Sequence, residues 1–200
     1  MSDLFDRLKR VFDDGHGEEL DGLLTDEDFA EEGSRPAAVL VPVTQRERPG
    51  VILTRRPGNL RSHPGQVAFP GGKIDGGETP VEAALREADE ELAIAPANVR
   101  VIGSSDVYVT GTGFEVTPVL GVIPADLPLV PNPGEVESWF EVPLDILFDR
   151  SNYAANTVVW KGAERTYFEM EYDGYRIWGV TAAIIANLSR RMRLTEMFDG

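Results

Sequence analysis

The sequence predicts an α/β sandwich in which helices flank a mixed β-sheet. Segments of strand-like apolar character outnumber the helical ones, and one helix is expected near the middle of the chain and another near its C-terminus. The chain has 200 residues, of which 42% are hydrophobic, so it can bury one substantial core. One structural domain is therefore expected to account for most of its length.

The first 34 residues are predicted to form a helical extension ahead of a domain that spans residues 35–200. Apolar residues recur there at helical spacing, and they are Leu4, Phe5, Leu8, Val11 and Phe12. Polar residues interrupt this run, so it lacks the continuous apolar core of a signal peptide. We expect a short helix that lies on the surface or packs in a homodimer, followed by a hydrophilic stretch over residues 13–34.

The domain is expected to begin with two strands, over residues 37–43 and 51–56. An irregular arm, rich in Gly and Pro, follows over residues 57–72. From Arg48 to Ile74 the chain carries five basic residues and no acidic one, although its net charge is −15. Residues 75–91 reverse this balance with seven acidic residues and one arginine. The reversal suggests a site that holds an anionic substrate beside metal cations.

The central helix has a clear start signal. Thr79 and Glu82 have the spacing of a capping box, and Pro80 suits the first helical position, so the helix is predicted to begin at Pro80. A buried stripe is expected from the residues at helical spacing, which are Val81, Ala84, Leu85, Ala88 and Leu92.

A second edge of this helix is crowded with carboxylates. Glu87, Glu90 and Glu91 stand three and four residues apart, so each like-charge pair costs roughly a few tenths of a kcal/mol. They also lie near the C-terminal end of the helix, where the dipole disfavours negative charge. A solvated surface edge would tolerate this pattern, whereas a divalent cation would turn the repulsion into ligation. The Gly71-Gly72 turn before the helix could add a backbone carbonyl to such a site.

The second half of the chain is predicted to supply more strands and the last helix. Strand candidates cover residues 99–109, 115–123 and 135–142, and after a polar break over residues 149–156 two further segments cover 157–162 and 165–175. Residues 181–192 have an amphipathic helical pattern, with Ala182, Ile185 and Leu188 on one side.

Composition excludes several classes of site and partner. The chain has no cysteine, which rules out disulfides, thiolate zinc sites and a thiol nucleophile, and is compatible with the reducing cytoplasm where we expect the protein to lie. No stretch approaches the roughly 20 apolar residues of a membrane span. The net charge of −15 argues against binding to nucleic acid or to an anionic membrane, so a small-molecule substrate is the expected partner.

The spacing of the polar and glycine residues around the central helix resembles the signature box of the Nudix hydrolases. The match runs from Gly72 through Glu78 to the segment Arg86-Glu87-Ala88-Asp89-Glu90-Glu91. Six defined positions at fixed spacing on a loop-helix unit make this a specific signal. Ala93 stands where the family usually has Gly, and Ala88 fills an aliphatic position that is often larger.

A second resemblance, to the coenzyme A diphosphatase branch of that family, extends over residues 52–72. Its matching positions are Leu53, Thr54, Arg61, Gly65 and Phe69-Pro70-Gly71-Gly72, while Pro57 replaces the small residue common there. Residues 108–114, 131–136 and 178–182 are also similar to that branch. The resemblance covers roughly residues 36–193.

The resemblance implies the Nudix α/β/α sandwich and a metal-dependent diphosphate hydrolase. Glu87, Glu90, Glu91 and the Gly72 carbonyl would bind Mg²⁺ or Mn²⁺, and Arg86 would orient the carboxylates. Glu135 would act as general base or as an additional metal ligand, although an exposed loop glutamate is ordinarily only solvated. Candidate substrate-binding residues are Arg55, Arg61, His63, Gln66 and Phe69. Coenzyme A would give 4'-phosphopantetheine and adenosine 3',5'-bisphosphate through attack of water on one phosphorus.

Other functions stay open from the sequence. An ADP-ribose or dinucleoside polyphosphate hydrolase would use the same box with a different substrate arm. A noncatalytic Nudix-like nucleotide-binding module is the alternative outside enzymes, but such modules typically lose the box glutamates that this chain keeps. The sequence has no phosphate-binding GxxxxGK[ST] loop and no HExxH motif.

Overall fold

The computed structural model describes residues 3–33, 35–59 and 64–193. The α-helices are α1 (Leu4–His16), α2 (Pro80–Leu92), α3 (Leu144–Leu147) and α4 (Val180–Met192), and the 3₁₀ turns are η1 (Glu27–Phe29), η2 (Pro96–Asn98) and η3 (Arg150–Asn152). The strands are β1 (Arg35–Gln45), β2 (Gly50–Arg55), β3 (Val67–Ala68), β4 (Gly71–Lys73), β5 (Arg100–Ser104), β6 (Tyr108–Val109), β7 (Phe114–Pro124), β8 (Ser138–Pro143), β9 (Ala154–Trp160), β10 (Ala163–Tyr172) and β11 (Tyr175–Trp178).

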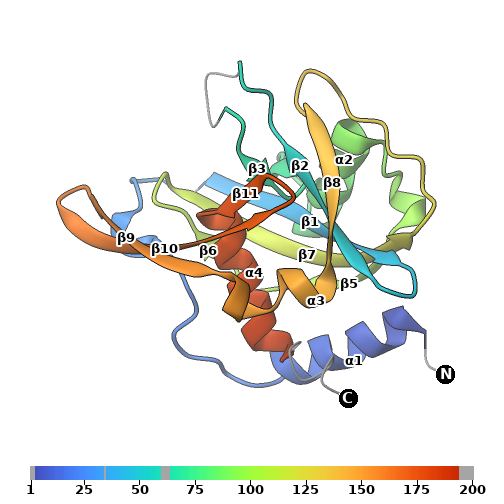
Figure 1. The fold of residues 1–200 in the computed structure, drawn as a ribbon, viewed down its shortest axis with the longest axis horizontal. Coiled ribbons are helices and arrows are strands. Elements are labelled where there is room, and N and C mark those ends of the chain that lie inside the picture. Colours follow the sequence, from blue (N-terminus) through green and yellow to red (C-terminus); the bar gives the residue numbers. More distant parts are fainter. Residues whose placement is uncertain (1–2, 34, 60–63, 194–200) are drawn as a thin grey trace.

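The main sheet is mixed and is centred on β1 (Figure 1). β1 pairs in parallel with β7 over its full length, and on its other edge it pairs antiparallel with β2 and β4. The outer pairs, formed by β3 and β8 with β2 and by β5 and β6 with β7, are all antiparallel. A separate antiparallel sheet has the order β11-β10-β9.

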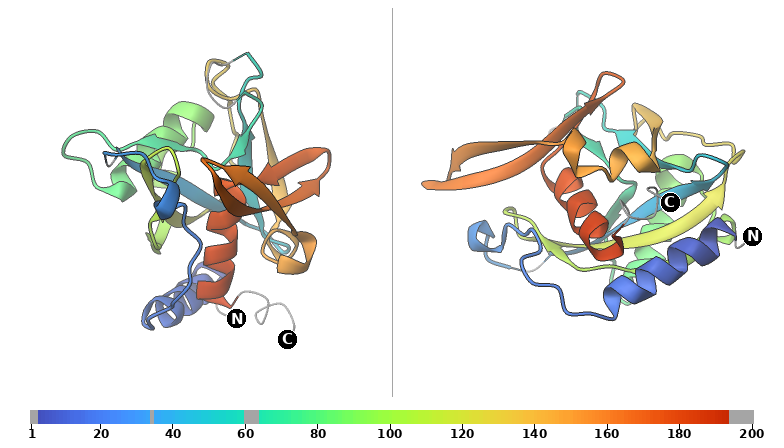
Figure 2. Two further views of the ribbon diagram at one scale, coloured as in Figure 1. Left: turned by 90° about the vertical axis from the view of Figure 1, so that its left-hand side faces the viewer. Right: turned by 60° about the horizontal axis from the view of Figure 1, so that its bottom comes forward.

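The two faces of the main sheet carry different helices (Figure 2). Side chains alternate between the faces along a strand, so Ala38 and Leu40 of β1 pack with α2 in one hydrophobic cluster. Val41 and Val43 pack with α4 in the other cluster. The predicted sandwich with a mixed sheet between helices is therefore confirmed.

Helix α1 packs against its own chain. Leu8 and Phe12 belong to the same buried cluster as α4, and Phe12 lies against Gly103 of β5, where a side chain would collide with its ring. The predicted helix exists, and its apolar stripe is covered within the chain. The alternative that it packs in a homodimer stays a prediction. The division of the chain at residue 34 stays a prediction.

Helix α4 is buried on nearly all sides, which its amphipathic pattern did not predict. Its three buried polar side chains are all hydrogen-bonded, as burial requires, and the first of them, Thr181, donates to the Val67 carbonyl at 3.0 Å. Asn187 exchanges two hydrogen bonds with the backbone of Leu24, and Ser189 donates to the Phe148 carbonyl. The segment after α1 thus covers the far side of α4. No helix within the described residues is long and apolar enough to cross a membrane.

Several predicted boundaries in the second half differ from the structure, and the segment expected over residues 165–175 is divided between β10 and β11. The strand expected over residues 99–109 is divided into β5 and β6, because the chain leaves the sheet and places the Asp106 carboxylate against Arg191 of α4 at 2.7 Å. β8 begins only at Ser138, because Asn132 holds the preceding residues in a turn. The expected polar break over residues 149–156 contains η3 and also the start of β9.

Candidate active site

The loop-helix unit β4-α2 is built as its sequence predicts. The Thr79 hydroxyl accepts a hydrogen bond from the Glu82 amide at 3.2 Å, and the Glu82 carboxylate accepts one from the Thr79 amide at 2.8 Å. The capping box is therefore confirmed, and α2 begins at Pro80. Leu92 is fully buried against the sheet, so the stripe fixes which edge of α2 bears the carboxylates.

Helix α2 ends at an alanine in the left-handed conformation. Ala93 has φ 57° and ψ 34°, and its amide donates to the carbonyls of Ala88 and Asp89. This conformation costs an L-residue with a Cβ roughly 1–2 kcal/mol, and glycine avoids that cost. Helix α2 therefore ends in the conformation that glycine usually adopts at this position, although the residue here is a strained alanine.

Three carboxylates converge beside this unit. One oxygen from each of Glu87, Glu91 and Glu135 lies within 4.8 Å of the others. Glu91 is only 4% exposed and accepts a hydrogen bond from the Gly71 amide at 3.2 Å. The structure therefore brings two glutamates of α2 together with the predicted loop glutamate, which lies 44 residues after Glu91 in the chain.

Burial and mutual repulsion disfavour the charged forms of Glu87 and Glu91. Burial, reinforced by the charges of Glu135 and Glu87, raises the pKa of Glu91 to about 8, although the Gly71 amide and the charge of Arg56 act in the opposite direction. Burial also raises the pKa of Glu87, against the lowering effect of Arg86. Without a cation, the cluster is an unfavourable place to hold three negative charges.

The two glycines of the preceding turn fit tightly against their surroundings. A Cβ on Gly71 would collide with the carbonyl of Ala38, and a Cβ on Gly72 would collide with the Glu87 carboxylate. The backbone of β4 can therefore approach the carboxylates closely only because these positions lack side chains. This geometry suits the predicted contribution of the Gly72 carbonyl, which stays a prediction.

Arg86 holds the acidic groups of the loop and the helix in place. Its guanidinium donates to Glu78 at 2.7 Å, to Glu87 at 2.9 Å and to the Lys73 carbonyl at 3.1 Å. Arg86 and Glu78 therefore form an ion pair that ties the loop to the helix. Glu90 is not part of the three-carboxylate cluster, because its half-exposed side chain faces Arg86 at 3.4 Å. Its predicted role as a metal ligand remains a prediction.

Asn132 is a positioning residue that our sequence reasoning missed. Its amide donates to the Glu91 carbonyl at 2.9 Å, and its side-chain nitrogen donates to Glu135 Oε1 at 3.3 Å. Its carbonyl accepts from the amides of Glu135 and Val136. This one residue fixes the Glu135 loop to the end of α2. The only signal in the sequence was the Pro-Asn-Pro-Gly segment, which indicates a turn but not its partner.

The basic segment from Arg48 to Ile74 contributes one residue near the cluster that was not among our substrate-binding candidates. The charge of Arg56 acts on Glu91, and its Nε is buried with no hydrogen-bond partner among the residues that the structure describes. Arg55, which was a candidate, instead pairs with Glu137 at 3.2 Å. Alternation along the extended chain could have separated the two arginines, because Arg56 directly follows the last residue of β2 and neighbouring side chains point to opposite faces.

The structure places the remaining substrate-binding candidates of the arm in different environments. Phe69 is 4% exposed and packs in the hydrophobic cluster below the arm, so its side chain is a packing group. Gln66 is partly exposed, and its carbonyl accepts a hydrogen bond from the Arg56 amide at 3.0 Å. Arg61 and His63 lie outside the described residues.

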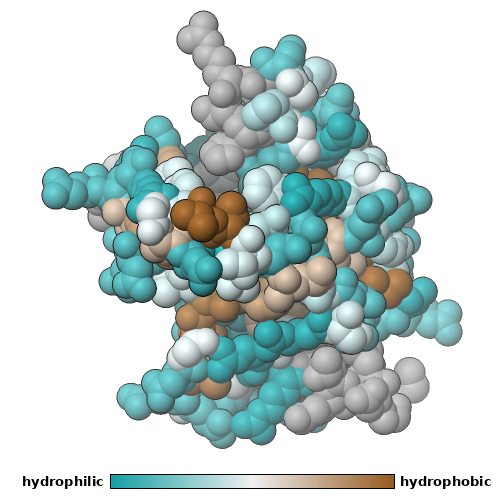
Figure 3. All heavy atoms as spheres, turned by 60° about the vertical axis from the view of Figure 1, so that its left-hand side comes forward, coloured by the Kyte–Doolittle hydropathy of each residue, from teal (hydrophilic) through white to brown (hydrophobic). Residues whose placement is uncertain are grey.

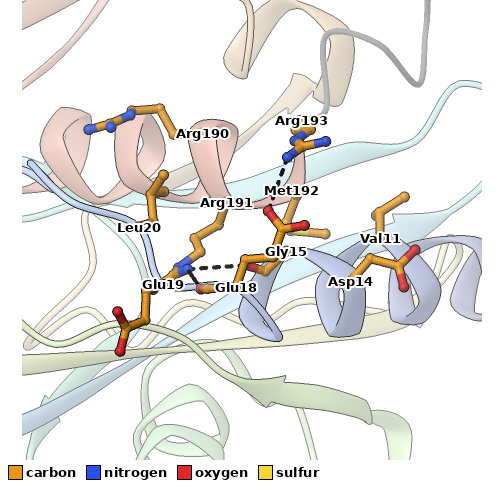
Figure 4. A pocket seen from close by; sticks show the side chains of 10 residues that line it. All are labelled: Val11, Asp14, Gly15, Glu18, Glu19, Leu20, Arg190, Arg191, Met192 and Arg193. Carbon is orange, nitrogen blue, oxygen red and sulfur yellow. Dashed lines mark hydrogen bonds and ion pairs between the residues drawn. The ribbon is translucent and has the colours of Figure 1, made fainter.

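A cavity of about 340 Å³ lies elsewhere, between the C-terminal ends of α1 and α4 (Figure 4). Its lining mixes both charges, and Arg191 there is already bonded to the carbonyls of Gly15 and Glu18 and to Asp106. None of the clustered carboxylates lines it. The chemistry predicted from the sequence therefore belongs to the α2 carboxylates and not to this cavity.

Comparison with known proteins decides the family. Residues 34–160 match the NUDIX domain. The chain belongs to the Nudix family. It is 45% identical over 156 residues to "Uncharacterized Nudix hydrolase NudL" of Escherichia fergusonii, which covers 78% of this chain and 81% of that relative. It is 43% identical over 162 residues to the protein of the same name from Shigella flexneri, with coverage of 80% and 84%.

The solved structure of RenU, a Nudix hydrolase from M. Smegmatis, has the same fold. The TM-score is 0.57 at 22% identity, over 90% of this chain and 97% of that one. The protein is thus a Nudix hydrolase, which acts on a nucleoside diphosphate linked to another moiety. Members of this family generally use divalent metal ions.

Proposed function

We propose that this Nudix hydrolase cleaves the diphosphate of coenzyme A or its derivatives into 4'-phosphopantetheine and adenosine 3',5'-bisphosphate, with Mg²⁺ or Mn²⁺ as cofactor. The observation that carries the chemistry is the convergence of Glu87, Glu91 and Glu135 within 4.8 Å. The choice of substrate rests on the resemblance of residues 52–72 to the coenzyme A diphosphatase branch.

The donor set of the cluster fits a hard divalent cation. Carboxylate and carbonyl oxygens are the ligands that Mg²⁺ and Mn²⁺ prefer, and Mg²⁺ commonly shares its sites with substrate phosphates. Glu87 and Glu91 would hold the ion, with Glu90 and the Gly72 carbonyl as the further predicted ligands and Glu135 beside them as general base or additional ligand. A bound cation would supply nucleophile activation and neutralisation of phosphate charge. The unfavourable crowding of negative charge in the cluster supports this assignment.

Neighbouring residues would hold these carboxylates in fixed orientations. Arg86 bridges Glu78 and Glu87, so it restricts the Glu87 carboxylate to one orientation. Asn132 does the same for Glu135. Glu135 is the candidate for the general base, because it comes from a separate loop and not from the helix edge. The alternative role, as an additional ligand, uses the same position.

Arg56, which directly precedes the arm, is the described residue best suited to meet the substrate. A guanidinium presents a forked set of donors that fits phosphate oxygens, and the Nε of Arg56 is buried without a partner in the described part of the chain. Arg61 and His63, which lie outside the described residues, remain predicted substrate contacts. A cytoplasmic location also remains our proposal, supported by the cysteine-free composition.

The experiment is a product analysis with coenzyme A, ADP-ribose and diadenosine tetraphosphate, each at equal concentration with and without Mg²⁺. We expect the highest kcat/KM for coenzyme A and no turnover in EDTA. Glu91→Gln should lower turnover about 100-fold or more while the protein remains folded by circular dichroism.

Preference for ADP-ribose or for diadenosine tetraphosphate would overturn the proposed substrate. The assignment as a diphosphate hydrolase would still hold. Full activity of Glu91→Gln at saturating Mg²⁺ would remove this glutamate from the metal site. Binding of all three nucleotides without hydrolysis in the presence of Mg²⁺ or Mn²⁺ would favour the noncatalytic module.

A further inference from the structure

Strand β9 forms one edge of the small sheet, and it pairs only with β10 among the residues that the structure describes. The β9-β10 hairpin extends from the body of the molecule, at the left in Figure 1. An exposed strand edge offers a row of backbone donors and acceptors to a further strand. The question is which groups this edge offers and to what partner.

The turn of the hairpin fixes which backbone groups point outward. Lys161 and Gly162 have φ values of 50° and 83°, which is the geometry of a two-residue type I′ turn. Trp160 and Ala163 flank this turn as partners, so they form a hydrogen-bonded pair. The pattern then alternates along β9. The amide and carbonyl groups of Ala155, Thr157 and Val159 therefore point away from β10, into the open edge.

The edge lacks the features with which proteins usually protect exposed strands. Residues 154–160, with the sequence AANTVVW, contain no charged residue and no proline. Val158 is 43% exposed and Val159 is 70% exposed. Figure 3 shows the side of the molecule that is on the left in Figure 1, where apolar side chains lie among hydrophilic ones. In a chain of net charge −15, an uncharged edge is where two copies can approach with least repulsion.

The edge is also held in a fixed place before any partner arrives. Arg165 of β10 forms a buried ion pair with Asp26, at 2.6 Å from its Nε, and Lys161 donates to the Phe29 carbonyl at 3.0 Å. The Trp160 ring lies 5.6 Å from that of Phe29. Side chains make these contacts, so they anchor the hairpin and leave the outward backbone groups of β9 available. A preorganised edge loses less entropy on association.

We propose that two copies of the chain pair through β9 in an antiparallel arrangement centred on Thr157. This pairing would join the two small sheets into a single six-stranded sheet. Thr157 would lie opposite Thr157 of the second copy, and Ala155 opposite Val159. All three outward-facing residues then find partners at once, because the segment is complementary to itself about that centre. Each copy would satisfy backbone groups that otherwise bind water.

Side chains support the same centre. Thr157 already lies opposite Thr166 of β10, with 3.5 Å between their hydroxyl oxygens. Two-fold pairing would extend this into a row of four threonines across the joined sheets, and threonine pairs across strands are favourable. Val159 would pack over Ala155, which leaves room for its branched side chain. This interface does not use the carboxylate cluster, so it stands independently of the proposed substrate.

The test is sedimentation equilibrium of the full chain over roughly 1 to 200 µM, the range in which a small interface of this kind associates. Wild type should show a monomer-dimer equilibrium. Val159→Lys should weaken the dimer at least tenfold, because it places a charge in the paired edge. Val107→Lys is the matched control, since it adds the same charge at a 50% exposed valine outside the small sheet, and it should associate like wild type.

A second measurement tests the register. The chain has no cysteine, so Thr157→Cys gives one thiol per copy, which would lie roughly 5.5 Å from its counterpart between Cα atoms. Mild oxidation should link the copies through this residue, and Val107→Cys should not link. A wild type that stays monomeric at 200 µM would overturn the proposal. So would a dimer that Val159→Lys leaves intact, or one that Thr157→Cys fails to link.

Discussion

The replacement Glu91→Gln tests whether a buried carboxylate is held at the site at the expense of stability. Glu91 is 4% exposed, and burial raises its pKa from the ordinary value of 4.5 to about 8. Glutamine keeps the size of the side chain and an oxygen that can accept from the Gly71 amide at 3.2 Å. The substitution therefore removes the titration and little else.

The sign and size of the effect follow from the difference in proton binding. Below pH 4.5 the folded and unfolded chains both carry the proton on Glu91, and above pH 8 neither does. Between these values Glu91 is protonated only in the folded chain. The stabilisation that this proton contributes to the folded state is therefore complete at low pH and is lost as pH rises. The free energy of unfolding should fall by up to about 1.4 kcal/mol per pH unit, or about 2 to 3 kcal/mol from pH 5.5 to 7.5.

The assay is urea unfolding in EDTA at several values between pH 5.5 and 7.5 and constant ionic strength. Relative to wild type, Glu91→Gln should become more stable as the pH rises, by the amount above. Asp89→Asn is the matched control, because it removes one charge from the exposed side of the same helix, where water solvates the carboxylate in both states. Equal pH dependence of Glu91→Gln and wild type would refute the reasoning.

Three further predictions concern the supports of the site. Thr79→Ala should lower the free energy of unfolding by about 1 kcal/mol in urea, since it removes the hydroxyl of the capping box, and an unchanged midpoint would contradict that role. Ala93→Gly should raise the melting temperature by an amount equivalent to about 0.5 kcal/mol, because glycine relieves the left-handed alanine; a lower value would show that no strain is stored there. Asn132→Ala should reduce kcat about tenfold and raise the Mg²⁺ concentration needed for half-maximal activity, because Glu135 loses its side-chain partner. Unchanged metal dependence would show that this hydrogen bond does not position Glu135.

The features that were predicted accurately from the sequence are those that depend on local signals. The capping box located the start of α2 at Pro80, and the apolar stripe showed which edge would face away from the sheet. Apolar runs located the strands β1, β2 and β7, although not how they pair. These features depend on residues within a few positions of one another, so the sequence contains them directly.

Long-range contacts explain what the sequence did not reveal. The break between β5 and β6 depends on Arg191, 85 residues from Asp106 along the chain, and no local pattern announces that pair. The near-complete burial of α4 depends on Leu24, which lies in a stretch that reads as a hydrophilic connection. Asn132 was hidden for the same reason, because its partner Glu91 lies on another element.

Metal binding at the carboxylate cluster is the central claim, and the most direct measurement is the titration of Mn²⁺ by electron paramagnetic resonance. Wild type should take up Mn²⁺, and Glu91→Gln should bind it at least tenfold more weakly, because one charged ligand is lost. Asp89→Asn should bind like wild type. Equal Mn²⁺ affinity for wild type and Glu91→Gln, or no uptake by wild type, would contradict the account.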